Sequence, residues 1–151
     1  MKVICSEQLE WTTRVDHGSF LGRRKELGGD KLGCGLWELP PGKKSFPFHL
    51  HHVTEEAMFV VSGSAKVRTP EGLNPISKGD FVSFPAGGPA HQLINDGSEP
   101  LIYLAISAGA GADVVEYPDA GKVACSHGKW PNMKHFIFNA KDQADYWAGE
   151  D

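Results

Sequence analysis

Residues 48–56 carry the side chains with the clearest chemistry in this sequence. They read Phe-His-Leu-His-His-Val-Thr-Glu-Glu, which places three histidines and two glutamates within nine residues. Imidazole and carboxylate groups are the ligands of divalent transition metals such as Zn, Fe(II), Mn and Ni. The segment is therefore a candidate metal-binding segment, and its geometry depends on the element that holds it.

Strand alternation determines which of these histidines share a face. In a β-strand, residues two apart point to the same side. His49 and His51 then lie together, while His52 falls on the opposite side if the strand continues.

The two glutamates lie where a further strand is expected to begin. Glu56 would share a face with Met58 and Val60. A carboxylate that points inward beside apolar residues is costly unless something compensates it, and a cation does so directly. Glu55 remains an alternative if the turn at Thr54 is tighter.

Short apolar runs separated by turn residues indicate an all-β protein. The sequence contains 18 Gly and 10 Pro, and turn formers recur between the runs. Residues 140–148, after a candidate N-cap at Asn139, predict one short C-terminal helix. The pattern is typical of a sandwich or small barrel. The main predicted strands lie at residues 31–39, 57–61, 65–69, 81–84, 91–94 and 101–107.

Length and charge narrow the classes of protein. A chain of 151 residues is expected to form one domain, with extension strands in 1–30, a barrel core in 31–107 and a tail in 108–151. The net charge of −4 disfavours nucleic acid and anionic membranes as partners. No apolar run approaches the roughly 18 residues that cross a bilayer. The N-terminus lacks an apolar signal-peptide core, so we expect a cytoplasmic protein.

Two segments of the sequence are patterned: they read His49-x-His51-x4-Glu56-x6-Gly63 and Gly79-x5-Pro85-x-Gly87-x3-His91-x3-Asn95. They resemble the two sequence motifs of the cupin superfamily, in the family's order and with a short link between them. Two gaps, before His49 and before His91, are each one residue longer than is common in cupins, and both fall in loops.

The resemblance implies a double-stranded β-helix barrel of the jelly-roll type that holds one divalent transition metal. Carried over position by position, the ligands would be His49, His51, Glu56 and His91. The six-residue gap to Gly63 favours Glu56 over Glu55 in this carry-over. The sequence does not distinguish Fe, Mn, Ni and Zn. Small cupins are commonly dimers, so we also expect a homodimer.

Cupins with a complete ligand set include dioxygenases, sugar-phosphate isomerases and decarboxylases. The resemblance therefore implies a metalloenzyme that acts on a small polar metabolite, a sugar phosphate or an organic acid, by isomerase or dioxygenase chemistry. We expect no organic cofactor. A non-catalytic barrel that binds or senses a small molecule is the alternative.

Several side chains are candidates to surround a substrate. If they face inward, Met58, Val60, Leu93 and Tyr103 would line a pocket, with Tyr103 as the candidate catalytic group. A sugar phosphate would also need a cationic contact for its phosphate. The sequence offers five cations for this contact without selecting one: Arg23, Arg24, Lys43, Lys44 and Lys122.

Overall fold

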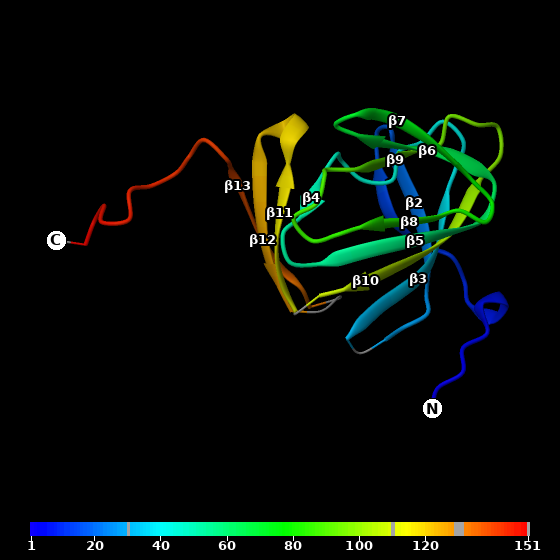
Figure 1. Cartoon of the computed structure of the whole chain (residues 1–151). Coiled ribbons are helices and arrows are strands. Elements are labelled where there is room, and N and C mark those ends of the chain that lie inside the picture. Colours follow the sequence, from blue (N-terminus) through cyan, green and yellow to red (C-terminus); the bar gives the residue numbers. More distant parts are fainter. Residues whose placement is uncertain (30, 110, 129–131, 151) are drawn as a thin grey trace.

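Antiparallel strands make up most of the computed structural model, which describes residues 1–29, 31–109, 111–128 and 132–150 (Figure 1). None of these residues forms a helix long and apolar enough to span a bilayer. The prediction of an all-β protein is confirmed. In chain order the elements are η1 (Ser6–Gln8), β1 (Thr12–His17), β2 (Phe20–Glu26), β3 (Leu32–Leu39), β4 (Leu50–His51), β5 (Glu55–Ser62), β6 (Ser64–Thr69), β7 (Gly72–Ser77), β8 (Phe81–Phe84), β9 (Gln92–Ile94), β10 (Leu101–Ala108), β11 (Ala112–Tyr117), η2 (Pro118–Ala120), β12 (Lys122–His127) and β13 (Lys134–Asn139).

The strands form three sheets that surround one interior. A six-stranded sheet has the order β1-β2-β3-β10-β5-β8, a three-stranded sheet has the order β7-β6-β9, and a four-stranded sheet has the order β13-β12-β11-β4. Figure 1 shows β6, β7 and β9 above the long strands β5 and β10, with β11, β12 and β13 standing at one end. The most apolar strand, β10, is central because it pairs with both β3 and β5.

Alternation along β5 separates the interior from the outer surface. Met58 and Val60 are buried at 2% and 0% exposure, whereas Phe59 and Val61 between and beyond them are exposed. Glu56 has the same parity as the buried pair, so it faces the interior as predicted. The buried core continues onto the neighbouring strands through Leu39, Val67, Leu93, Leu101 and Tyr103.

The two ends of the chain extend the sheets. Near the N-terminus, β1 and β2 add to the edge of the six-stranded sheet beside β3. Near the C-terminus, β11 and β12 form strands that the sequence analysis did not identify. The apolar content of β11 is modest, and its pairing with β4 and β12 supplies the hydrogen bonds that hold it extended.

The prediction of a helix over residues 140–148 is wrong. These residues form turns and irregular backbone, and the carboxamide of Asn139 donates to Asp142 instead of capping a helix. Tyr146 and Trp147 are exposed, so no apolar face of this segment packs against the barrel. A helix this short is marginal in water without such packing.

Candidate metal site

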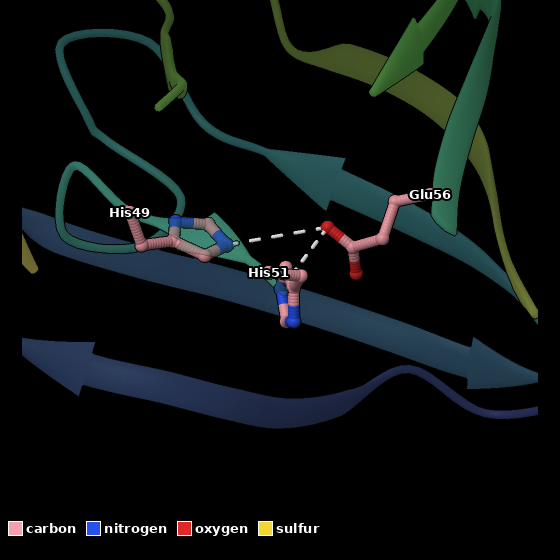
Figure 2. A group of neighbouring side chains, drawn as sticks. All are labelled: His49, His51 and Glu56. Atoms are coloured by element: carbon pink, nitrogen blue, oxygen red, sulfur yellow. Dashed lines mark ion pairs between the residues drawn. The ribbon is translucent and has the colours of Figure 1, made fainter. Parts of the chain in front are cut away.

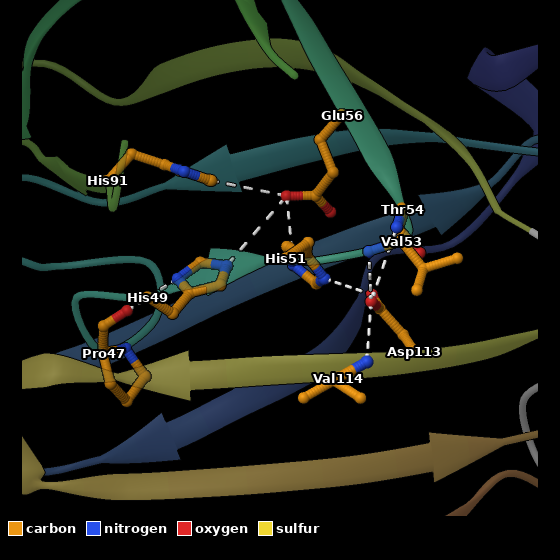
Figure 3. Close-up of polar contacts among 9 residues, drawn as sticks. All are labelled: Pro47, His49, His51, Val53, Thr54, Glu56, His91, Asp113 and Val114. Carbon is orange, nitrogen blue, oxygen red and sulfur yellow. Dashed lines mark hydrogen bonds and ion pairs between the residues drawn. The ribbon is translucent and has the colours of Figure 1, made fainter. Parts of the chain in front are cut away.

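Three histidine nitrogens point toward one carboxylate oxygen of Glu56. The Nε2 atoms of His51 and His91 each lie 3.4 Å from Glu56 Oε2, and His49 Nε2 lies 4.0 Å from the same atom. Figure 2 shows His49, His51 and Glu56 facing one another, and Figure 3 adds His91, whose ring points toward the same carboxylate oxygen. The structure thus brings together all four residues that the cupin resemblance implied as ligands.

Backbone pairing holds the two separate histidine segments side by side. His49 and His91 form an isolated antiparallel bridge, with His49 N–H donating to His91 O at 3.1 Å and His91 N–H donating to His49 O at 2.7 Å. Their ring centroids consequently lie 4.6 Å apart. Two residues after His49, β4 pairs with β11 and places His51 opposite Val115.

Hydrogen bonds at the other ring nitrogens orient two of the histidines. His49 Nδ1 lies 2.8 Å from Pro47 O, and a carbonyl oxygen can only accept, so Nδ1 carries the hydrogen. His51 Nδ1 lies 2.5 Å from Asp113 Oδ2 and donates in the same way. With the hydrogen on Nδ1, the Nε2 atom of each ring faces Glu56, the arrangement by which histidines bind metals.

Asp113 is a site residue that the sequence analysis missed. Its other carboxylate oxygen accepts hydrogen bonds from the backbone N–H groups of Val53, Thr54 and Val114 (Figure 3). Burial acts to raise the pKa of Asp113, but the hydrogen bonds from His51, Thr54 and Val53 outweigh it and lower the pKa. No local pattern marks this residue, because it reaches His51 only through the pairing of β4 with β11.

The charge states of the cluster suit a divalent cation. Burial, followed by the proximity of His91, lowers the pKa of His49 to about 4, so this ring is neutral at neutral pH. Burial acts to raise the pKa of Glu56, but the contact with His91 and the nearby His51 and His49 lower it overall, so the group is ionised. Neutral imidazoles and an ionised carboxylate are the forms that bind metal.

The distances within the cluster also fit a shared ion. Two ligand atoms each about 2.1 Å from one metal ion lie about 3.0–3.4 Å apart at octahedral or tetrahedral angles. The separations of 3.4 Å from Glu56 Oε2 to His51 and His91 lie at the upper end of this range, whereas the 4.0 Å separation from His49 Nε2 lies above it. His49, His51 and Glu56 offer ligand atoms within 4.8 Å of one another. The donor set therefore fits one divalent transition metal.

The two alternative residues of the histidine segment face away from this cluster. Glu55 is exposed. His52 is also exposed, and its Nε2 lies 2.7 Å from Glu116 Oε1 on the outer side of β11. Strand alternation accounts for both orientations.

The cluster opens into a cavity of about 840 Å³ in the barrel interior. Met58, Leu93 and Tyr103 line it as expected, but Val60 is fully buried and does not belong to its wall. Burial, and then the charge of Glu56, raises the pKa of Tyr103, so the hydroxyl stays protonated at neutral pH. Among the five candidate cations, the cavity wall includes Arg24 and none of the other four.

Aromatic rings enclose the histidines on two sides. The ring of Phe84 stacks on that of His91 with centroids 3.8 Å apart and an interplanar angle of 13°. Tyr117, at the end of β11, lies nearly parallel to His49 with a centroid distance of 6.2 Å. These contacts restrict how the histidine rings can turn, and no local sequence pattern predicts that Phe84 stacks on His91.

Comparison with known proteins agrees with this fold. The family model for the cupin domain matches residues 35–107. A search of curated proteins found no significant match. A crystal structure from Acidithiobacillus ferrooxidans, provisionally named a sugar phosphate isomerase, is 31% identical with a TM-score of 0.83, over 92% of this chain and 90% of the other.

Two further solved structures share the fold. A cupin-superfamily sugar phosphate isomerase from Silicibacter pomeroyi is 23% identical with a TM-score of 0.77, over 89% of this chain and 92% of the other. A predicted oxalate decarboxylase from Thermotoga maritima is 19% identical with a TM-score of 0.63, over 72% of this chain and all of the other. The chain belongs to the cupin superfamily, and its fold is the double-stranded β-helix barrel.

Proposed function

We propose that this protein is a divalent-metal-dependent cupin enzyme that isomerises a sugar phosphate. The observation that carries the proposal is the convergence of three histidines and Glu56 on the wall of a cavity of about 840 Å³. The resemblance to proteins named as sugar phosphate isomerases supports the substrate class. The cavity is large enough for a ligand of metabolite size.

The cluster residues and Tyr103 have separable roles in this proposal. His49, His51, Glu56 and His91 would hold the metal, which polarises substrate oxygens when bound. Asp113 orients His51 through the hydrogen bond at Nδ1. Because its pKa is raised, Tyr103 serves as a hydrogen-bond donor to a substrate oxygen and not as a base.

Metal content tests the first half of the proposal. Elemental analysis after reconstitution should give about one equivalent of a transition metal in the wild type and in His52→Ala, and far less in the double variant His51→Ala/His91→Ala. His52→Ala is the matched control because His52 faces away from the cluster. Less than about 0.1 equivalent in the wild type would contradict metal binding.

Solvent isotope exchange tests the second half. Isomerisation through proton transfer should place deuterium from D₂O next to the carbonyl carbon of a sugar phosphate, as followed by ¹H NMR, without oxygen consumption. Oxygen consumption with an organic acid would instead identify a dioxygenase. A rise in thermal stability with no turnover would identify a binding barrel.

A further inference from the structure

Arg24 brings a fixed positive charge to the cavity that holds the histidine cluster. It lies on β2 opposite Trp37 of β3, and its side chain is 20% exposed. Among the described residues that line the cavity, the lysine and arginine side chains are those of Arg24 and the exposed Lys31. Arg24 is therefore the partly buried cation of this wall.

The surrounding strands are shaped to hold the guanidinium. Gly35 on β3 lies beside it, and a Cβ at that position would come within 2.2 Å of Arg24 Nε. The Cζ atom of Arg24 lies 5.4 Å from the centre of the Trp37 ring, within the range of a cation–π contact. Any larger residue at position 35 would displace Arg24 from this place.

The described residues use only part of the hydrogen-bonding capacity of this guanidinium. An Nη2–H group of Arg24 donates to Glu26 Oε1 at 2.9 Å, while the buried Nε has no acceptor among the described residues. An unpaired buried donor is costly, so this N–H group favours an acceptor that a ligand could supply.

Arg24 and Glu56 lie at different parts of the same cavity. Across the six-stranded sheet, β2 and β5 are separated by three strand spacings, or about 14 Å between backbones. Tyr103 lies on β10 between them, and its pKa is raised by burial and by Glu56 and lowered by Arg24. A single ligand of sugar-phosphate length can therefore approach both groups.

We propose that Arg24 determines substrate specificity by binding the anionic end of the substrate, a phosphate or a carboxylate. The carbons of the same molecule that carry hydroxyl or carbonyl oxygens would then face the histidine cluster. The planar fork of N–H donors in a guanidinium matches the oxygens of both anions. An oxyanion beside Arg24 would also offer an acceptor to this guanidinium, whose Nε has none among the described residues. The second contact, at the histidine cluster, rests on the proposed function.

Thermal unfolding with matched ligands tests this role. D-ribose 5-phosphate and D-ribonate should raise the Tm of the wild type more than neutral D-ribose at the same concentration. Arg24→Gln should weaken the affinity for the anions about ten- to hundredfold. Arg24→Lys should give an intermediate loss, because it keeps the charge without the fork. The comparison of phosphate with ribonate identifies which anion the site prefers.

Arg23→Gln is the matched control, since it removes the same charge one residue away. Arg23 pairs with Glu38 and does not line the cavity, so this variant should keep wild-type anion binding. The Tm and metal content of each variant without ligand establish that it folds. Anion binding that is unchanged in Arg24→Gln, equally reduced in Arg23→Gln, or absent from the wild type would overturn the proposal.

The same measurement on metal-free protein separates this inference from the proposed function. Anion binding that depends on Arg24 in a protein that takes up no transition metal would support the role of Arg24 and contradict the metal-dependent enzyme. If the protein instead binds one metal ion, and the wild type and Arg24→Gln bind the anions equally well, the result would contradict the role of Arg24 and leave the metal-dependent enzyme supported.

Discussion

Asp113 connects the histidine cluster to the four-stranded sheet. Its carboxylate holds His51 Nδ1 at 2.5 Å and accepts backbone N–H groups with its other oxygen. Asp113→Asn keeps the shape of the side chain but removes its charge. We expect metal affinity to fall about 10- to 100-fold, as is usual when the outer partner of a metal-binding histidine is changed.

Competition with a chromophoric chelator measures this change in affinity. Asp119→Asn is the control, because Asp119 pairs with Arg68 and neither residue lines the cavity. Equal metal affinities for wild type and Asp113→Asn would show that the contact with His51 has no influence on the metal.

His49 predicts a pH dependence of stability in the metal-free protein. Its pKa is about 4 in the folded state, chiefly through burial, against an ordinary value of 6.5. Between these values the unfolded chain binds a proton that the folded chain does not, so stability falls as the pH is lowered through this window. The loss amounts to up to about 3 kcal/mol and is absent above pH 6.5.

Urea unfolding of metal-free wild type and His49→Gln across pH 4–7 checks this expectation. The variant lacks the titrating ring, so the difference in unfolding free energy between the two proteins should change through this window. A difference that stays constant with pH would show that His49 does not titrate as its surroundings indicate.

At the level of elements, the turn at Gly63 joins β5 to β6 and is the most constrained of the motif glycines. Its φ is +80°, and a Cβ there would lie 2.4 Å from the carbonyl oxygen of Pro100. Gly79 has a φ of +96° but open space around it. A substitution at Gly79 would therefore cause backbone strain alone, whereas one at Gly63 would cause backbone strain and steric overlap.

Alanine at the two positions should destabilise the protein unequally. Gly79→Ala should lower the unfolding free energy by about 1–2 kcal/mol through backbone strain alone. Gly63→Ala should lower the unfolding free energy by about 1–3 kcal/mol more than Gly79→Ala does, because its methyl group also overlaps the backbone at Pro100. Urea unfolding at neutral pH measures both values, and equal losses would contradict the steric account.

For the whole molecule, the homodimer expected from the family resemblance remains a prediction. The edge strand β13 carries exposed Phe136, Ile137 and Phe138, and apolar side chains on an open sheet edge favour association. Gel filtration with light scattering should give twice the chain mass. The mass of a single chain at micromolar concentration would contradict the prediction.

Much of the barrel could be predicted from short-range spacing, whereas the full histidine cluster also needed the resemblance to the second cupin motif, which supplied His91. Alternation over two residues placed His49 with His51, and the same rule set Glu56 beside Met58 on the inner face of β5. Exposed turns and strands of weak apolar character were harder to predict. Residues 140–148 had a helical composition but nothing to pack against.

The segment of residues 48–56 thus indicated the kind of ligand set, and its resemblance to a cupin motif that ends at Gly63 selected His49, His51 and Glu56. It could not identify Asp113, which lies 62 positions from His51, or single out Arg24 from the other cations. Those contacts depend on which strands pair and how the sheets close around the interior. Pairing between distant strands is set by the packing of the whole barrel, and no local spacing records it.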